Sequence, residues 1–368
     1  MRVNHRAIIA GLVACCALIA ACGSSDDSSS TAAGASTSGS TSTAAPSVHS
    51  GPKLSIPSAT NPAVASKTVG VVTLTSASEV FSREYAAIQK AATVLGWKVK
   101  QANMNGDVSK AGSAVQNLLQ SGVDGIILQS VEPTLLGAKA VADAKAKDVP
   151  IVETFSVFNS KTSKGVLAAS VNADYVAAQA AVDKEMLADL GGSGEIALVN
   201  DKLASEGVVP EQQLRKDVAG KIKIVATHQM NYANLVPDIS ATVTTWLTQY
   251  PSLKAVWCPY DGPCVGAAQA IQSANKQVRV YSQDGVTSIL KLMRQGVDIT
   301  TAAAPLEYAN WLAVDQLNSI WGKRDFERDQ IIPTVIVDKS NVPKTGDIDG
   351  TQQYGDFETA FKKRWGVG

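Results

Sequence analysis

The sequence predicts an α/β protein with two similar lobes, each a parallel sheet flanked by helices. From Thr68 onward, short runs rich in β-branched residues alternate with stretches whose apolar residues recur at helical spacing, which is typical of successive βα units. The expected strands are almost continuously apolar, as strands are when helices cover both faces of a sheet. The chain of 368 residues is long enough for about two domains, and the pattern restarts near Glu195.

The first set of βα units begins with an apolar run over 68–74, TVGVVTL, which predicts a strand. A helix is expected over 80–95 because its apolar residues share one face, and Gly96 is a natural stop after it. Asp107 is the expected cap of the next helix. The other elements expected in this set are strands over 97–102, 123–128, 149–154 and 166–171, and helices over 107–121, 133–147 and 174–190.

The second set repeats this alternation. In open parallel sheets a ligand lies outside the carboxyl ends of the strands, so we expect the site just after Leu74, Leu128, Thr154, Cys258 and Gln283. The elements expected in this set are strands over 195–199, 222–227, 255–258, 278–283, 299–303 and 331–337, and helices over 208–218, 236–250, 262–275, 286–295 and 306–321.

The N-terminal segment has the layout of a secretory signal over 1–21, with Arg2 and Arg6 followed by an apolar stretch too short to span a bilayer. It ends in IAAC, and this resembles a bacterial lipobox, in which the cysteine, here Cys22, is lipidated after cleavage. An ordinary signal peptide with an incidental cysteine is the alternative. The Ser/Thr-rich segment that follows predicts a disordered linker, so that 22–66 forms the lipidated cysteine and its tether.

Charge and composition exclude several classes of function. The chain has 33 Lys and Arg residues and 33 Asp and Glu residues, without a basic block, which argues against nucleic-acid binding. Cys258 and Cys264 are the only thiols of the folded region; they either form a disulfide or stay as two small buried side chains. His228 is its only histidine and is expected to end a strand without doing chemistry. No metal site, cofactor or catalytic residue is predicted.

The run from about Thr68 to Lys323 resembles the periplasmic binding proteins of the ribose/galactose type. The resemblance is carried by VGVVTL with Phe81, LLQSGVDGIILQSVEP, WCPYDGPCVGAAQAI and VYSQDGVTSILKLMRQG. It implies the type I fold, in which two Rossmann-like lobes are joined by a hinge of three crossings. The crossings are expected near 171–172, 303–305 and 332–333, so that lobe one comprises 67–171 plus 304–332 and lobe two comprises 172–303 plus 333–368. A short helix over 356–365 is also expected.

The resemblance implies an extracytoplasmic, lipid-anchored solute-binding protein of an ABC importer, on the bacterial cell membrane. It would be a monomer that captures a sugar or related small organic solute by hinge closure and presents it to a membrane permease. An aromatic or other non-sugar solute is one alternative, and a sensor for a membrane receptor kinase is another. An enzyme would need a nucleophile–base pair or a metal cluster, and the sequence shows neither.

The resemblance also implies a ligand site. Phe81 matches an aromatic that stacks on the ligand, and Asp284 matches a carboxylate of the family's pocket. Ser78 stands where the family has a polar side chain, and Tyr260-Asp261 stands in place of its Asn-Asp pair. Phe155 occupies one of the positions of its Asp-Arg pair. The ligand-binding residues expected on this basis are Ser78, Phe81, Phe155, Tyr260, Asp261 and Asp284.

Each of these residues has a structural alternative: Phe81 could be core, Phe155 and Tyr260 could be inter-lobe packing, and the two Asp residues could be helix caps. Relative to the family, the sequence lacks the arginines and the glutamine that hold sugar hydroxyls. This departure predicts a cleft that is more apolar and more acidic, and a solute with an aromatic, aliphatic or amine-bearing body beside the default sugar.

Overall fold

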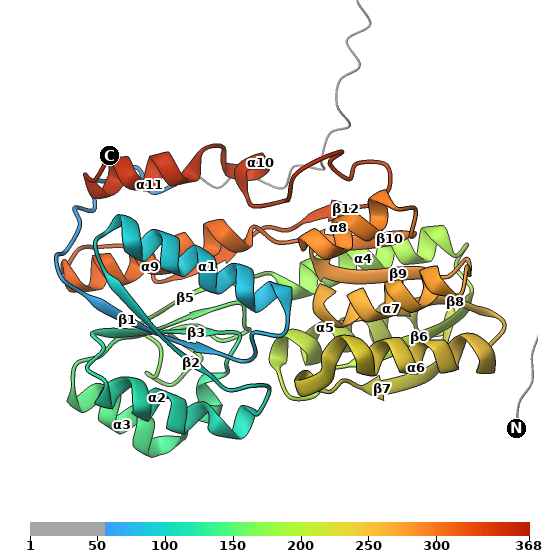
Figure 1. The fold of residues 1–368 in the computed structure, drawn as a ribbon, viewed down its shortest axis with the longest axis horizontal. Coiled ribbons are helices and arrows are strands. Elements are labelled where there is room, and N and C mark those ends of the chain that lie inside the picture. The colour runs from blue at the N-terminus through green and yellow to red at the C-terminus, as the bar shows by residue number, and fades with distance from the viewer. Residues whose placement is uncertain (1–55) are drawn as a thin grey trace, which may run out of the picture. The chain divides into compact units, whose positions relative to one another are not determined.

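The computed structural model of this protein describes residues 56–368 (Figure 1). The predicted signal peptide, Cys22 and the linker as far as residue 55 lie outside the described residues. Within that part of the chain there are two six-stranded sheets, with strand orders β11-β5-β4-β3-β1-β2 and β12-β10-β9-β8-β6-β7. All pairings are parallel except β10 with β12. The predicted two-lobed α/β architecture is therefore confirmed.

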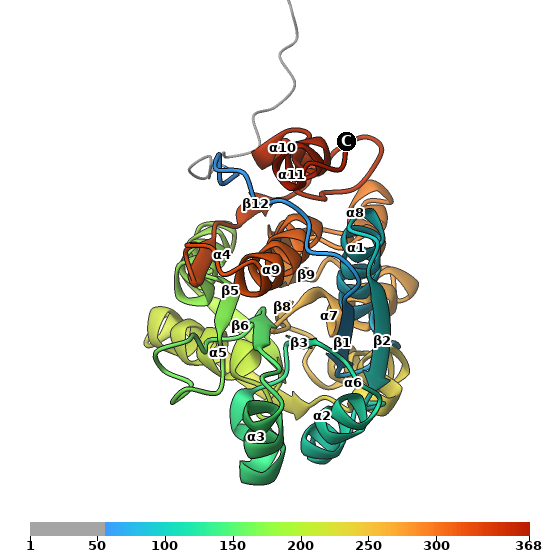
Figure 2. The same cartoon turned by 90° about the vertical axis from the view of Figure 1, so that its left-hand side faces the viewer.

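Lobe one is built on the first sheet. Val69, Val71 and Val72 of β1, an interior strand, are fully buried, because α1 and α9 cover one face of the sheet and α2 and α3 cover the other, as Figures 1 and 2 show. The strands are β1 (Thr68–Thr73), β2 (Lys98–Asn103), β3 (Gly125–Gln129), β4 (Ile151–Thr154), β5 (Ala169–Ala173) and β11 (Asp329–Ile332). The helices are α1 (Glu79–Val94), η1 (Val108–Lys110), α2 (Ala111–Gln120), η2 (Pro133–Leu136), α3 (Gly137–Ala146) and α9 (Leu306–Trp321).

Lobe two is built on the second sheet, with α6 packed beside α7 and α4 beside α5. Its strands are β6 (Gly194–Asn200), β7 (Ile222–Gln229), β8 (Leu253–Trp257), β9 (Arg279–Asp284), β10 (Ile299–Ala303) and β12 (Val335–Val337). Its helices are α4 (Tyr175–Asp189), α5 (Ser205–Val218), η3 (Tyr232–Asn234), α6 (Leu235–Gln249), α7 (Asp261–Ser273) and α8 (Thr287–Arg294).

Local signals in the sequence account for many element boundaries. Asp107 accepts a hydrogen bond from the Ser109 backbone N–H at the start of η1, and Asp174 accepts one from Ala177 at the start of α4. Each element expected between residues 68 and 321 has a counterpart within a few residues. The single strand expected over 331–337 is wrong: it is two short strands in different sheets, separated by Pro333, which has no backbone N–H to donate.

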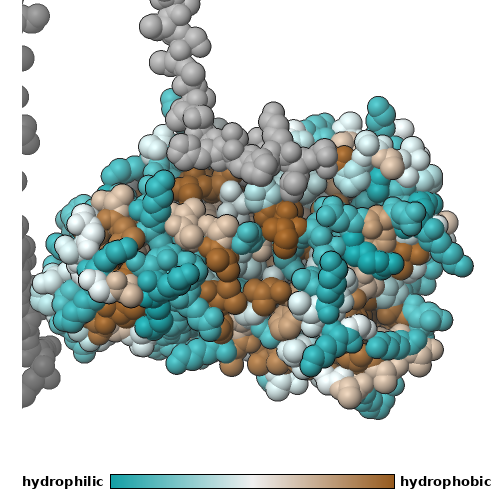
Figure 3. All heavy atoms as spheres, turned by 180° about the vertical axis from the view of Figure 1, so that it is seen from behind, coloured by the Kyte–Doolittle hydropathy of each residue, from teal (hydrophilic) through white to brown (hydrophobic). Residues whose placement is uncertain are grey.

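The chain passes between the lobes after β5, after β10 and after β11. The disulfide Cys258–Cys264 joins the residue after β8 to the first turn of α7. His228 lies in β7, where its Nε2 is 3.0 Å from the Asp238 carboxylate. None of the helices in residues 56–368 is long and apolar enough to cross a membrane. The face drawn in Figure 3 carries both polar and apolar side chains.

The C-terminal tail corrects two predicted boundaries. The expected helix is present as α11 (Phe357–Trp365) after a short turn of helix, α10 (Thr351–Tyr354), but α11 packs on α9 of lobe one rather than on lobe two. The Arg364 Nε lies 2.9 Å from the Asp315 carboxylate of α9. Asn61, expected in the linker, is buried and donates to the same carboxylate at 2.7 Å. The folded part therefore begins before residue 67, and its first residues lie beside α11.

Candidate functional site

A small buried cavity lies between the lobes. It has a volume of about 20 Å³, enough for about one water molecule, so the lobes are closed on it. Its walls come from the carboxyl ends of β3, β4 and β9 and from the helices and loops that follow strands, which is where parallel sheets bind ligands. The lining residues are Val80, Phe81, Glu84, Ser130, Phe155, Tyr175, Glu206, Pro259, Tyr260 and Asp284.

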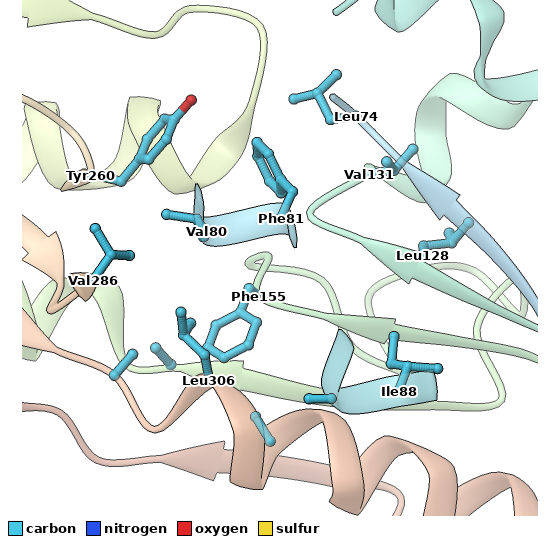
Figure 4. Packing of buried hydrophobic residues seen from close by; sticks show 14 of the residues in the cluster. Leu74, Val80, Phe81, Ile88, Leu128, Val131, Phe155, Tyr260, Val286 and Leu306 are labelled. Carbon is cyan, nitrogen blue, oxygen red and sulfur yellow. The ribbon is translucent and has the colours of Figure 1, made fainter. Parts of the chain in front are cut away.

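Aromatic side chains form much of the wall. Phe81 of α1 and Tyr260 of the β8–α7 loop face each other from opposite lobes, with ring centroids 6.1 Å apart and planes inclined at 60°. Phe155 follows β4 and also lines the cavity; its ring lies beside Leu306 (Figure 4). Tyr175 begins α4. All four are buried, so a ligand between the lobes would be enclosed by aromatic faces and edges.

Three carboxyl groups complete the lining, and no Lys, Arg or His is among the lining residues. Glu84 comes from α1, Glu206 from the first turn of α5 and Asp284 from the end of β9. Burial raises the pKa of each well above its ordinary value, and neighbouring carboxyl groups raise it further. Those neighbours are Asp284 and Glu307 for Glu84, Asp201 for Glu206, and Asp261 for Asp284.

Several polar atoms of the cavity residues have no partner in the described structure. Glu84 Oε1, Glu206 Oε2 and Tyr260 Oη are buried and make no hydrogen bond. The other oxygen of Glu84 has only a long contact, 3.4 Å, with Gln129 Nε2. Buried polar groups in native proteins are rarely left unsatisfied. The cavity therefore presents acceptors and a hydroxyl to whatever occupies it.

The positive charge of Arg83, the residue before Glu84, is already paired with a carboxylate. Arg83 of α1 forms a bidentate pair with Glu307, with both N–O distances 2.9 Å. It also donates to the Ile348 carbonyl at 2.9 Å and makes a 3.5 Å contact with the Gly285 carbonyl. This arginine thus joins lobe one to lobe two and to the C-terminal tail. Its charge is paired outside the cavity lining.

The backbone at the cavity is strained. Ser130, Phe155 and Asp284, each at or just after the end of a strand, have positive φ angles of 51°, 58° and 104°. A positive φ is uncommon outside glycine, and for a bulky residue such as Phe it is an outlier. Such strain persists where the surrounding structure enforces it, and it clusters at functional sites. Three such residues lining one small cavity support its assignment as the binding site.

The structure brings together four of the six predicted ligand residues: Phe81, Phe155, Tyr260 and Asp284 line the cavity. Ser78 does not; it is the N-cap residue of α1, and its hydroxyl faces the lobe-two backbone, since a Cβ on Gly262 would lie 2.8 Å from it.

Asp261 also lies outside the lining. Its carboxylate accepts hydrogen bonds from Val286 N at 2.7 Å, from Thr301 Oγ1 at 3.1 Å and from the Ser282 hydroxyl. Burial raises the pKa of Asp261 to about 7, against the opposing effect of these bonds. These hydrogen bonds hold the segment before α8, and the N-cap residue of α7 is Tyr260 rather than Asp261.

Six lining residues are outside the predicted set: Val80, Glu84, Ser130, Tyr175, Glu206 and Pro259. Glu84 was recoverable, because it lies three residues after Phe81 and therefore on the same face of α1. Ser130 directly follows β3, in a loop where ligand residues were expected. Glu206 and Tyr175 begin helices of lobe two, and no local signal distinguishes them from other helix starts.

Comparisons with known proteins identify the family of this chain. The model of the periplasmic binding protein domain matches residues 69–324. A xylitol-binding protein of Mycolicibacterium smegmatis is 29% identical over 246 residues, covering 65% of this chain and 68% of that protein. A ribose import binding protein of Bacillus subtilis is 26% identical over 268 residues, covering 69% and 81%.

Among solved structures, an ABC transporter solute binding protein from Agrobacterium vitis with bound allitol has a TM-score of 0.67 at 20% identity. The match covers 75% of this chain and 97% of that one. At this identity the likeness shows the fold. The relatives found are binding proteins, which agrees with the expectation that this chain is not an enzyme.

Proposed function

Because this chain belongs to the periplasmic binding protein domain family, we propose that it is the solute-binding component of an ABC importer. Its solute is a sugar, a polyol or a related small organic molecule. The binding of xylitol and ribose named for its relatives supports this class. The observation that carries the proposal is the closed inter-lobe cavity, whose buried Glu206 and Tyr260 atoms lack partners.

In this proposal the ligand residues are Phe81, Phe155, Tyr260 and Asp284, together with the residues that the structure adds, Glu84 and Glu206. The cavity as it stands holds about one water molecule. A solute therefore requires the lobes to open and to close again around it, a hinge motion about the three crossings. The closed form is the state that a permease would recognise.

Contacts across the cleft support this closed state. Glu79 of α1 accepts hydrogen bonds from the Ser288 backbone N–H, at 3.0 Å, and from its hydroxyl. Ser288 lies in the first turn of α8, whose own cap residue Val286 offers no side-chain acceptor. Lobe one thus supplies the N-terminal acceptor for a helix of lobe two. Opening the cleft would break this bond.

We further propose that Cys22 carries the lipid that anchors the protein outside the cytoplasm, on the sequence grounds given above. A single acyl chain gives only marginal membrane binding, so a multiply acylated cysteine is expected for stable anchoring. With Cys22→Ala, the protein should be lost from the membrane fraction, as measured by cell fractionation. Retention of the variant in the membrane would contradict the anchor.

The binding function is tested on the full chain purified in mild detergent. Sugars, polyols and small amines are screened by thermal unfolding, because a ligand that binds only the folded form raises the melting temperature. Small-angle X-ray scattering then compares dimensions with and without a saturating ligand. Stabilisation together with a more compact ligand-bound state is expected. The absence of stabilisation by every solute class, or turnover of the bound solute, would overturn the proposal.

A further inference from the structure

The cleft that captures the solute combines negative charge with aromatic surface. Glu84, Glu206 and Asp284 approach one cavity from three elements, and each is at most 7% exposed. Phe81 and Tyr260 stand on opposite sides of the same space. A neutral hydroxylated ring can be held by hydrogen bonds alone, so this concentration of carboxyl groups calls for another explanation.

The second observation is independent of the number of acidic residues. Glu84 Oε1 and Glu206 Oε2 have no hydrogen-bond partner, although both side chains are more than nine-tenths buried and line the cavity. The Tyr260 hydroxyl is in the same situation. Acceptors of this kind cost free energy in an empty protein unless they are satisfied. They indicate the position of a group that the protein does not itself provide, one with several hydrogens to donate.

The positive charge that usually balances such a site is absent. Sugar sites often set a carboxylate beside an arginine, so that each group satisfies the other and the ligand hydroxyls. Here Arg83 is the basic group that acts on Glu84 and Asp284, and its Nε and Nη2 atoms are paired with the Glu307 carboxylate. The lining contains no other basic side chain. Arg83 acts on Glu84 and Asp284 from outside the lining, so a counter-charge inside the cavity would come with the solute.

We propose that the solute carries a protonated amine, and that its ammonium group sits among Glu84, Glu206 and Asp284 beside the rings of Phe81 and Tyr260. This inference rests on the proposed function and narrows it to amino sugars, amino polyols and compact alkylammonium compounds. An ammonium group has three N–H donors, matching the open acceptors. Its charge offsets the cost of burying carboxylates, and the faces of aromatic rings attract it.

Matched pairs of solutes test the role of the charge. The purified full chain is titrated calorimetrically with glucosamine, glucose and N-acetylglucosamine, with glucamine and sorbitol, and with choline and 3,3-dimethylbutanol. We expect at least one amine to bind 10-fold or more tightly than its neutral counterpart, a difference of about 1.4 kcal/mol. Binding of neutral members as tight as that of every amine, or tighter, would overturn the inference while leaving the proposed function standing. No binding by any member would overturn both.

Variants test the position of the ammonium group. Glu84→Gln and Glu206→Gln each keep the shape of the side chain and remove its charge. The ratio of amine to neutral affinity should fall about 10- to 100-fold in each. Glu327→Gln, on the exposed surface of lobe one, removes the same charge and should leave the ratio unchanged. Equal losses of amine and neutral binding would show a purely structural role and contradict the proposal.

Tyr260→Phe is the second readout, in case a glutamine variant does not fold. It removes only the unpartnered hydroxyl, and we expect a loss of about 3- to 10-fold in amine affinity. Unchanged amine affinity in this variant would place the ammonium elsewhere and contradict the proposed arrangement.

Discussion

Two buried polar clusters of this protein contrast sharply. Under the C-terminal helix, the Asp315 carboxylate accepts hydrogen bonds from Asn61 Nδ2, Arg364 Nε and Trp365 Nε1, at 2.7, 2.9 and 2.7 Å. In the cleft, Glu206 is equally buried but has an oxygen with no partner. The first cluster is completed when the chain folds. The second is incomplete until another molecule arrives.

The difference distinguishes carboxyl groups that are buried with partners from the protein itself from carboxyl groups that are buried without them. Around Asp315, the rings of Trp311 and Trp365 stack 5.4 Å apart beside a charge pair in which Asp315 Oδ1 accepts three hydrogen bonds. Around the cleft, Phe81 and Tyr260 exclude water from carboxyl groups that lack a counter-ion. Burying a carboxyl group therefore costs little free energy in the cluster around Asp315 and more in the ligand-free cleft. Each prediction below changes one of these two clusters.

The largest effect is expected from breaking the completed cluster. Arg364→Leu removes the counter-charge of Asp315 and leaves a buried carboxylate unpaired, which should lower the free energy of unfolding by about 3–5 kcal/mol. The measurement is urea unfolding followed by tryptophan fluorescence. Lys363→Leu, which removes an exposed positive charge from the neighbouring position, should change stability by less than about 0.5 kcal/mol. Similar losses in the two variants would contradict the contrast.

The buried carboxyl groups in and near the cleft should make the stability of the ligand-free protein depend on pH. Burial raises the pKa of Asp201 to about 6 and that of Asp261 to about 7, and it raises the pKa values of Glu84 and Glu206 as well. A folded state with raised carboxyl pKa values binds protons more tightly than the unfolded state, so its stability falls as pH rises. The ligand-free protein should lose about 1–3 kcal/mol between pH 5 and pH 8.

The control for this pH effect is Glu84→Gln, which cannot titrate and should show a shallower decline in the same denaturation series. A bound amine should also reduce the decline, because it favours the ionised carboxylates. Stability that stays level or rises over this range would show that the carboxyl groups are not held in the environment described.

Features that depend on neighbouring residues could be predicted from the sequence, whereas the direction of individual side chains could not. Strand and helix positions follow from apolar periodicity, which also predicts the strand-end loops that bear the site, whereas the resemblance to the family selected Phe81, Phe155, Tyr260 and Asp284 within and beside those loops. Asp261, one residue after Tyr260, occupies the same loop and yet points into the protein. Adjacent residues at a helix start project in different directions, and the packing of α7 against β9 and α8 decides which one lines the cavity.

Contacts between elements that are far apart in the chain could not be predicted from the sequence. The helix over 356–365 was predicted from its pattern, but an amphipathic helix does not specify the surface that it covers, and its partner α9 lies in the other lobe from the one expected. Glu206 likewise became a site residue only through the hinge, which brings the start of α5 opposite α1. Local sequence patterns predict individual helices and strands, whereas contacts between the lobes can be identified only from the three-dimensional structure.

A substitution at the contact between the lobes should weaken closure of the cleft. A Cβ on Gly106 of lobe one would lie 2.8 Å from the Cβ of Tyr232 in lobe two, and Gly106 has a φ of +81°. Gly106→Ala should therefore disfavour closure and weaken solute binding about 10-fold by titration calorimetry. Gly96→Ala is a matched control, because Gly96 has a φ of +71° and no neighbour within 4 Å. Equal effects on affinity would point to backbone strain alone.

The smallest effect is expected at the rim of the cleft, where Glu79 reaches across to the first turn of α8. Hydrogen bonds from Ser288 and Thr287 outweigh the effect of burial and lower the pKa of Glu79, whereas burial raises the pKa values of the cavity carboxyl groups. Glu79→Gln retains an acceptor and loses the charge that favours a helix N-terminus, worth about 0.3–1 kcal/mol. Solute affinity should fall about 2- to 5-fold, and the difference should shrink at high salt because screening weakens the charge interaction. An unchanged affinity at low salt would show that this cross-lobe bond does not contribute to closure, and that the solute alone holds the lobes together.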